Sequence, residues 1–260
     1  MENKNRRVVV KVGTSTLTHR TGKTNIRLMG ELVTVLSDLM NMGIQVTLVT
    51  SGAIGVGVGK LGLCERPEDT AGKQAAATVG QCELMFMYDK MFDEYSHTVG
   101  QLLITKEDMD DVKRRGNLVC AFEKLFEYGA IPIVNENDSV AVDEIVYGDN
   151  DTLSAEVAGL IGADTLIILT DTDGLYNKNP MLHEDAKRIS EVGVITDEIE
   201  SLAGGSVSGV GTGGMTTKIH AARIATARGI DTYVISGSAP RDIYGVFEGK
   251  DVGTHFKAHK

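Results

Sequence analysis

Apolar residues along this chain follow two different rhythms. In one, short runs of β-branched and other apolar residues predict strands, and these runs occupy residues 7–12, 44–49, 98–104, 131–134, 165–169 and 232–235. In the other, apolar residues recur at the three- and four-residue spacing of a helix, over residues 28–42, 73–95, 112–128, 151–161 and 215–228. Gly43 follows the first helix as a stop signal, and the alternating stretch 139–147 predicts a hairpin.

Strands that alternate with helices of this length predict βαβ units and a mainly parallel sheet covered by helices on both faces. The continuous apolar runs at 8–10 and 166–169 fit strands that are buried on both sides. No internal repeat, low-complexity segment or Pro/Ser-rich linker divides the 260 residues. We therefore expect a single α/β domain, 1–260, with two lobes.

Composition narrows the class of protein. The chain has 36 acidic and 26 basic residues, a formal net charge of −10, and no basic run, so it is a poor candidate for binding nucleic acid or an anionic membrane surface. Aromatic residues make up only 5% and Trp is absent, which disfavours a base-stacking platform. The 30 glycines against 4 prolines suggest tight turns and backbone that approaches a ligand closely.

Cysteine usage and the N-terminus indicate a compartment. Cys64, Cys82 and Cys120 are scattered and form no C-x-x-C pattern, which is typical of a reducing compartment without a disulfide framework or structural zinc. The first seven residues are largely polar and no apolar signal region follows them. Since no apolar run approaches the ~18 residues of a membrane span, we expect a soluble, cytoplasmic protein.

Small, polar and glycine residues follow four of the predicted strands. The segments are 11–16, 50–55, 135–138 and 170–174. In open α/β sheets, ligands collect beyond the carboxyl ends of the strands. We therefore expect these segments to line one polar, glycine-rich ligand crevice.

A glycine-rich stretch, 208–218, comes directly before a predicted helix and ends in Lys218. Backbone N–H groups at a helix start bind anions, and the helix dipole adds to the attraction. Gly209, Gly211 and Gly214 match G-x-G-x-x-G, but no predicted strand directly precedes them, as a dinucleotide-binding fingerprint requires. A Walker A loop is excluded because Met215 stands where that loop needs Lys. A plain flexible loop is the remaining alternative.

Two further charges stand out. Lys11 interrupts an otherwise buried-looking strand, and a buried lysine is normally paired. The turn 148–151, which ends in Asp151, resembles half of a calcium loop but lacks the EF-hand glycine and distal Glu. Its carboxylates either cap the following helix as an Asx turn, or orient lysines or contact a substrate, and the spacing leaves both open. No H-E-x-x-H or G-x-S-x-G motif supports zinc or triad hydrolysis.

Six segments, in order, resemble the motifs of the amino-acid kinase family. They read KVGTST at 11–16, VTSGAIGVG at 49–57, NENDSV at 135–140, GDNDTLSA at 148–155, LTDTDGLY at 169–176 and SGVGTGGMTTK at 208–218. The resemblance implies a three-layer αβα sandwich around a mainly parallel sheet. It also implies an N-terminal lobe for the substrate and a C-terminal lobe for the nucleotide. Some relatives carry a C-terminal RNA-modification-type (PUA) domain, which we expect to be absent from this chain.

Within this family the resemblance is to members that transfer phosphate from ATP, with Mg²⁺, to the γ-carboxylate of L-glutamate, the first step of proline synthesis. It implies catalytic roles for Lys11, Asp151 and Lys218 and no assigned metal ligand. The substrate-binding residues implied by the motifs are Ser51, Asp138 and Asn150. The implied nucleotide-binding residues are Lys11, Thr170, Asp171, Thr212, Gly213, Gly214, Met215, Thr216, Thr217 and Lys218.

The same resemblance implies partners. Free proline is expected as a feedback inhibitor, with the segment 135–148 and Glu144 tuning its effect. A homo-oligomer, dimer or tetramer, and contact with the next enzyme of the pathway are also expected. Two other functions stay open: a kinase for a different carboxylate or carbamate acceptor, and a nucleotide-binding sensor without turnover. The joint presence of Lys11, Asp151 and Lys218 favours the enzyme.

Overall fold

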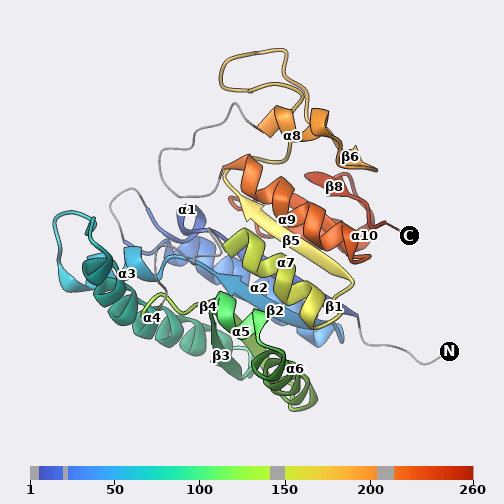
Figure 1. Ribbon diagram of the computed structural model, residues 1–260. Coiled ribbons are helices and arrows are strands. Elements are labelled where there is room, and N and C mark those ends of the chain that lie inside the picture. The colour runs from blue at the N-terminus through green and yellow to red at the C-terminus, as the bar shows by residue number, and fades with distance from the viewer. Residues whose placement is uncertain (1–5, 20–22, 141–149, 204–213, 260) are drawn as a thin grey trace.

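A computed structural model describes residues 6–19, 23–140, 150–203 and 214–259 of the chain (Figure 1). Eight strands of this part form one sheet in the order β3-β4-β2-β1-β5-β7-β8-β6. Every neighbouring pair is parallel except β7 and β8, which run antiparallel. The strands are β1 Arg7–Val12, β2 Gln45–Thr50, β3 Val99–Ile104, β4 Ile131–Glu136, β5 Thr165–Thr170, β6 Glu191–Val192, β7 Asp231–Ser236 and β8 Thr254–Phe256.

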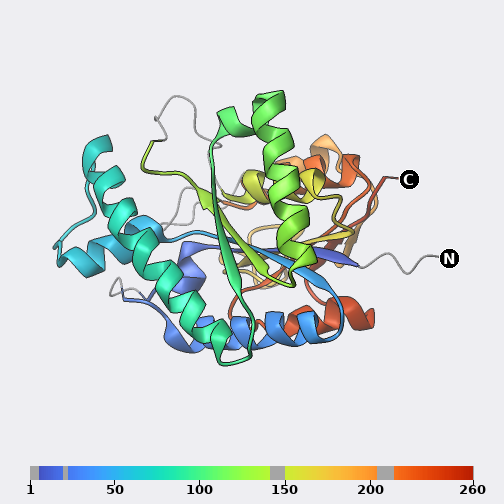
Figure 2. The same cartoon turned by 90° about the horizontal axis from the view of Figure 1, so that it is seen from below.

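Helices connect the strands and cover both faces of the sheet. They are α1 Thr14–Leu17, α2 Ile26–Asn41, α3 Ala53–Leu61, α4 Thr70–Asp93, α5 Lys106–Asp110, α6 Val112–Glu127, α7 Asn150–Leu160, α8 Asp197–Ala203, α9 Met215–Ala227 and α10 Asp242–Glu248. Figure 2 looks along the layers, with α2 and α10 on one side of the sheet and α6 on the other. The prediction of a three-layer αβα sandwich around a mainly parallel sheet is confirmed.

The alternation of side chains along each strand divides the core in two. In β1, Val8 and Val10 join the apolar residues of α2, α4 and α10 in one cluster. Val9 points to the opposite face and joins a second cluster with the apolar residues of α6, α7 and α9. Lys11 has the same parity as Val9, so the strand directs its side chain toward the α7 and α9 layer.

Local signals explain where several helices begin and end. The Asn25 side chain accepts a hydrogen bond from the Leu28 N–H at the start of α2, as an N-cap does. Beyond its end, Gly43 has a φ of 84°, a left-handed conformation that glycine adopts without steric cost. The predicted stop at Gly43 is therefore confirmed.

Helices α3 and α4 pack so closely that only glycine fits between them. A Cβ atom on Gly57 would lie 1.8 Å from the carbonyl oxygen of Ala76, and one on Gly80 would lie 1.8 Å from that of Ala53. The backbones of the two helices are thus in direct contact. This contact brings the N-terminal half of α4 up to the segment that follows β2.

The structure differs from the expected elements in specific places. Strand β4 continues through Asn135 and Glu136, which were expected in a loop, because these residues pair with Leu103 and Ile104 of β3. The short elements α1, α3, α5, α8, α10, β6 and β8 were not predicted, since each is too short to show a clear period. Of the predicted hairpin at 139–147, residues 141–147 lie outside the described part.

None of the helices in the described ranges is both long and apolar enough to cross a membrane.

Candidate functional site

The carboxyl ends of four neighbouring strands meet at one edge of the sheet. The order β4-β2-β1-β5 is parallel throughout, so the ends at Glu136, Thr50, Val12 and Thr170 share that edge. The segments that follow these ends are the ones expected to line a crevice. Their common location is confirmed by the strand order, and it gathers residues that are about a hundred positions apart in sequence.

Lys11, Asp151 and Lys218 form a buried ion-pair centre at this edge. The Lys11 Nζ lies 2.6 Å from Asp151 Oδ1, and the Lys218 Nζ lies 3.1 Å from Asp151 Oδ2. Asp151 is fully buried and each lysine is only 6% exposed. Strand β1, the first turn of α7 and the first turn of α9 supply one residue each, so the centre ties the sheet to both helices.

The threonine next to Lys218 supports the same carboxylate. The Thr217 hydroxyl donates to Asp151 Oδ2 at 2.8 Å, and it also lies 2.8 Å from the carbonyl oxygen of Gly214. Gly214 is the N-cap of α9 and has no side chain to cap the helix. No side chain caps the first N–H groups of α9 within the described residues, and the Lys218 Nζ lies at the same helix end, 3.4 Å from the Gly214 carbonyl oxygen.

Electrostatics keep Asp151 ionised. Burial raises the pKa of this carboxyl, but the charges of Lys11 and Lys218 and the hydrogen bonds from Lys11 and Thr217 outweigh it, so the net pKa is lowered. Two ammonium groups thus face one carboxylate. The centre has excess positive charge in a poorly solvated place, which suits an anionic group.

Ser51 and Asn150 lie together beside the ion-pair centre. The Asn150 Nδ2 group donates to Ser51 Oγ at 2.8 Å, to the Thr50 carbonyl at 3.1 Å and to Asn135 Oδ1 at 2.9 Å. Asn135 in turn donates from Nδ2 to Gln81 Oε1 at 2.8 Å. We call Gln81, Asn135 and Asn150 the amide relay.

Two members of this relay were not predicted as site residues. Asn135 lies within a motif that the sequence analysis singled out, three residues before Asp138, and this position was a usable signal. Gln81 lies in the interior of α4 and has no motif around it. Only the packing of α4 against α3 reveals that it reaches Asn135.

Asp138 lies two residues beyond the end of β4 and is partly buried. Burial raises the pKa of its carboxyl, and the positive charge of Arg66 offsets part of that rise. Within the described ranges, a hydrogen bond joins Ser51 to Asn150, and no hydrogen bond joins Asp138 to either of them. A carboxylate held with a raised pKa is stabilised by any cation that binds next to it.

The residues expected to contact a nucleotide fall into two groups. Thr170 is buried at the end of β5, and its hydroxyl donates to Asp171 Oδ1 at 3.0 Å. Gly214, Met215, Thr216, Thr217 and Lys218 form the start of α9. Thr212, Gly213 and the rest of the glycine-rich stretch before Gly214 lie outside the described residues, as does Glu144.

The acidic, histidine and cysteine residues of the described ranges are not grouped as metal ligands would be. No group of three or more His, Cys, Asp or Glu side chains that could hold a metal ion occurs there. Cys64, Cys82 and Cys120 are free and exposed. The acidic residue at the centre, Asp151, is already occupied by two ammonium groups.

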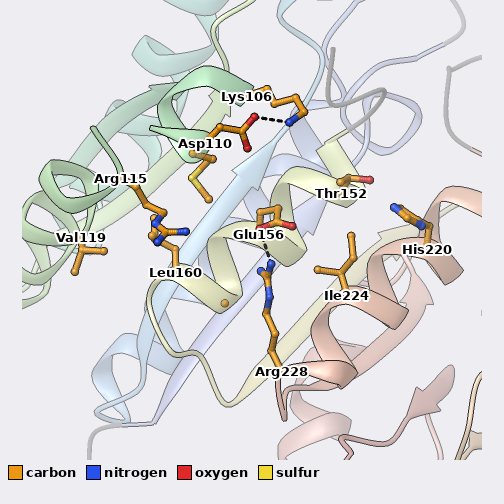
Figure 3. A pocket seen from close by; sticks show the side chains of 12 residues that line it. Lys106, Asp110, Arg115, Val119, Thr152, Glu156, Leu160, His220, Ile224 and Arg228 are labelled. Carbon is orange, nitrogen blue, oxygen red and sulfur yellow. Dashed lines mark hydrogen bonds and ion pairs between the residues drawn. The ribbon is translucent and has the colours of Figure 1, made fainter. Parts of the chain in front are cut away.

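A separate groove of about 790 Å³ lies between α5, α6, α7 and α9 (Figure 3). Its two acids are paired: Asp110 with Lys106 at 2.5 Å and Glu156 with Arg228 at 2.8 Å. The residues that α7 contributes come from its partly exposed side, whereas Asp151 is fully buried. The groove is thus distinct from the crevice expected at the strand ends.

An αβα sandwich that gathers two buried lysines and an aspartate at one edge of its sheet has the chemistry of a protein that binds an anionic ligand. Comparison with known families makes the class specific. The amino acid kinase family model matches residues 6–236, and the chain belongs to this family. The family resemblance drawn from the six motifs is thereby confirmed.

Curated relatives are similar over nearly the whole chain. The chain is 51% identical over 259 residues to a glutamate 5-kinase of Clostridium perfringens, covering 98% of this chain and 96% of that protein. It is 52% identical over 253 residues to a glutamate 5-kinase of Clostridium tetani, covering 97% and 95%. A glutamate 5-kinase of Moorella thermoacetica is 53% identical over 251 residues, but the match covers 96% of this chain and 66% of that longer protein.

Solved structures share the fold at low sequence identity. Carbamate kinase from Giardia lamblia bound to AMP-PNP has a TM-score of 0.68 at 16% identity and covers 98% of this chain and 99% of that chain. An isopentenyl phosphate kinase product complex from T. acidophilum has a TM-score of 0.67 at 18% identity and covers 96% and 100%. At such identities these similarities speak for the fold alone.

Proposed function

We propose that this protein transfers the γ-phosphoryl group of ATP to the γ-carboxylate of L-glutamate, forming L-glutamyl 5-phosphate, the first step of proline synthesis. The observation that carries the proposal is the buried ion-pair centre of Lys11, Asp151 and Lys218 at the strand ends. The close similarity to curated glutamate 5-kinases along nearly the full chain supports the choice of substrate.

The chemistry suits the residues present. The nucleophile is a carboxylate, which is ionised at neutral pH because a free glutamate side chain has a pKa of about 4.3. No general base is needed, so the work left to the protein is positioning and neutralisation of charge on the transferring group. Lys11 and Lys218 supply that charge, and Asp151 holds both ammonium groups in fixed positions.

Thr217 and the backbone at the start of α9 assist Lys218. The Thr217 hydroxyl shares Asp151 Oδ2 with Lys218, which limits the positions that the ammonium group can take. The uncapped N–H groups of α9 add donors for phosphate oxygens. We assign Thr170, Asp171 and the stretch from Thr212 to Lys218 to the nucleotide, and the C-terminal part of the single domain 1–260 to the nucleotide lobe.

Mg²⁺ is proposed to enter with ATP and to bridge its phosphates, where it neutralises charge on the phosphate oxygens. The described residues contain no acidic cluster that would hold the ion by itself. We therefore assign it no protein ligand and route no step through it.

Asp138, Ser51 and Asn150 are proposed to bind the glutamate acceptor. The raised pKa of the partly buried Asp138 carboxyl means that a neighbouring cation is favourable, and the α-ammonium group of a free amino acid is such a cation. Acetylation of that amine removes the charge. We therefore expect free L-glutamate to be a much better acceptor than N-acetylglutamate.

We also propose the setting in which the enzyme works. Free proline, which shares the α-amino and α-carboxylate groups of glutamate, is the expected feedback inhibitor, and the segment 135–148 with Glu144 is the expected determinant of sensitivity. A homo-oligomer, hand-over of the labile acyl phosphate to the next enzyme, and a cytoplasmic location complete the proposal. Three free, exposed cysteines agree with a reducing compartment.

A hydroxamate assay tests the function directly. Wild-type protein with ATP, Mg²⁺ and hydroxylamine is supplied in turn with L-glutamate, N-acetylglutamate, L-aspartate and carbamate, and acyl hydroxamate and ADP are measured. ADP formation that is rapid with L-glutamate and slow with the other three acceptors supports the proposal. ADP formation that is faster with carbamate or another acceptor points to a different kinase, and nucleotide binding without turnover on any acceptor points to a sensor.

A further inference from the structure

The amide relay connects helix α4 to the proposed acceptor site. Gln81 Oε1 accepts from Asn135 Nδ2 at 2.8 Å, and Asn135 Oδ1 accepts from Asn150 Nδ2 at 2.9 Å. Gln81 is 9% exposed and Asn135 is 2% exposed. These three amides come from α4, β4 and the first residue of α7, so the relay exists only in the folded chain.

Backbone groups identify the oxygen and nitrogen ends of two of the three amides, Asn135 and Asn150. The Glu136 N–H donates to Asn135 Oδ1 at 2.9 Å, so this oxygen, not the Asn135 nitrogen, faces Asn150. The Thr50 carbonyl accepts from Asn150 Nδ2 at 3.1 Å. Rotating the Asn150 amide by half a turn would set its oxygen against two other acceptor oxygens, which is unfavourable.

The relay leaves Asn150 with one free acceptor. Its NH₂ group has two hydrogens and already faces three acceptors: the Thr50 carbonyl, Ser51 Oγ and Asn135 Oδ1. Its Oδ1 is buried and has no hydrogen-bond partner among the described residues. A buried acceptor without a partner is destabilising and calls for an explanation. A ligand that brings an N–H donor satisfies it, whereas a carboxylate does not.

Gln81 is the far anchor of this arrangement. Its Oε1 accepts a hydrogen bond from the Asn135 Nδ2 group. Its own Nε2 is buried and has no hydrogen-bond partner within the described ranges. The residue thus has an unmet donor of its own while its oxygen holds Asn135. Glycine at position 80 allows the close contact between α4 and Ala53 of α3, and this contact sets the neighbouring Gln81 in reach of Asn135.

We propose that Gln81 is a positioning residue for acceptor specificity: through Asn135 it holds Asn150 with its carbonyl oxygen available to the α-ammonium group of the substrate. The inference rests on the proposed function, because it assumes an amino-acid acceptor. Asp138 then supplies the charge that attracts the ammonium group, and Asn150 supplies an acceptor of fixed direction. An acceptor without an α-amino group gains nothing from the relay.

Calorimetric titration with two ligands tests this proposal. L-Glutamate and glutarate have the same two carboxylates, but glutarate lacks the ammonium group. In Gln81→Met, which keeps side-chain volume and loses the acceptor oxygen, Asn150 is no longer held with its oxygen toward the ammonium group, and the Kd for L-glutamate is expected to rise about tenfold. The Kd for glutarate is expected to stay within about twofold.

In three further variants, the quantity to compare is the ratio of the Kd for glutarate to the Kd for L-glutamate. Gln81→Glu keeps an acceptor oxygen facing Asn135 and is expected to retain the wild-type ratio of the Kd for glutarate to the Kd for L-glutamate. Asn135→Ala breaks the relay in its middle and is expected to lower that ratio at least as far as Gln81→Met does. Thr226→Val, the control, removes a buried hydroxyl that bonds to the Ala222 carbonyl inside α9, and it is expected to lower the thermal midpoint without changing the ratio.

Equal weakening of both ligands in Gln81→Met and Asn135→Ala would overturn the proposal, since it would show a merely structural role. Unchanged L-glutamate binding in both variants would overturn it as well. Failure of the proposed function is distinguishable: a wild-type protein that binds L-glutamate with a Gln81-dependent ratio but does not phosphorylate it contradicts the kinase assignment alone.

Discussion

Asp151 forms ion pairs with two buried lysines. The effect of a substitution on stability and activity depends on which of these three charges it removes. Lys11 and Lys218 come from elements that are far apart in sequence and meet only at this carboxylate. Each lysine is held by contacts that do not depend on a ligand. Single-residue changes here are therefore expected to separate catalysis from folding in a measurable way.

Lys218→Ala is expected to retain the fold and to lower kcat by about 10²–10³-fold, by analogy with the loss of one transition-state charge contact. Steady-state kinetics and circular dichroism measure the two effects. Lys250→Ala, at an exposed lysine paired with Glu248, is the matched control and should leave kcat unchanged. A near-normal kcat in Lys218→Ala would remove this lysine from the catalytic centre.

Asp151→Asn is expected to destabilise the protein by about 3–5 kcal/mol near pH 7, because it leaves two buried lysines without their counter-charge. The folded pKa of Asp151 is lowered, so its stabilising contribution is present above the unfolded pKa of about 3.9 and is lost as pH falls through the lower folded pKa. Urea unfolding of wild type and variant from pH 7 to pH 3 measures the difference. A difference that stays constant across this range contradicts the assignment.

Asp138→Ala is expected to raise the KM for L-glutamate at least about tenfold, because an unpaired member of a desolvated charge pair costs about 2–5 kcal/mol, while the KM for ATP changes little. Since burial raises the pKa of Asp138, the wild-type KM for L-glutamate should also rise as pH falls through that raised pKa, and this pH dependence should disappear in the variant. Glu127→Ala, at an exposed acid, is the control. A parallel loss of ATP affinity would argue against an acceptor role.

At the scale of elements, two glycines allow α3 and α4 to approach until their backbones touch. This contact is a property of the helix pair and not of a single side chain. It also orders the relay residue Gln81, which follows one of these glycines.

Gly80→Ala is expected to destabilise the protein, because the new Cβ would lie 1.8 Å from the Ala53 carbonyl oxygen and must push two backbones apart, at a cost of about 1–3 kcal/mol or more. Gly116→Ala in α6 is a matched control, because nothing lies within 4 Å of its Cβ position, and alanine should stabilise that helix by about 0.5–1 kcal/mol. Urea unfolding of both variants measures the change in the free energy of unfolding, which should fall in Gly80→Ala and rise in Gly116→Ala. Equal effects of the two substitutions would contradict the close-packing account.

At the scale of the whole molecule, the parallel sheet gathers four strand ends at one edge, and this arrangement places the residues proposed for the acceptor near those proposed for the nucleotide. The ion pairs of Lys11, Asp151 and Lys218 connect the sheet to both α7 and α9. A ligand bound by the proposed acceptor residues would thus contact the elements that we propose to hold the phosphoryl group. Inhibition by a small analogue of the acceptor needs no second site.

Proline is expected to inhibit competitively with L-glutamate at millimolar concentration, because it shares the α-amino and α-carboxylate groups of L-glutamate and would compete for the proposed acceptor site. Initial rates at several L-glutamate concentrations, with and without proline, measure the effect. Glu144→Ala is expected to change the inhibition constant and leave the KM for ATP as it was. A rate unaffected by millimolar proline would contradict feedback inhibition in this protein.

Hydrophobic periodicity by itself determined the long elements and the fold class, because burial of an apolar face is a local property that repeats every two or 3.6 residues. The resemblance of six ordered motifs to the amino-acid kinase family indicated most of the candidate site, including Lys11, Ser51, Asn150, Asp151 and Lys218. Both the periodicity and the motifs can be read directly from the amino-acid sequence. The short elements have too few residues to display a period, and they were missed for that reason.

Tertiary structure alone decided which residues meet. The extension of β4 through Asn135 depends on pairing with β3, a contact that no local pattern encodes. Asp151 becomes a shared partner of two lysines only when β1, α7 and α9 converge, and Gln81 joins the site only because glycines bring α3 and α4 into contact. Propensity and pattern act between near neighbours in sequence, whereas these interactions join groups that only packing brings within hydrogen-bond distance.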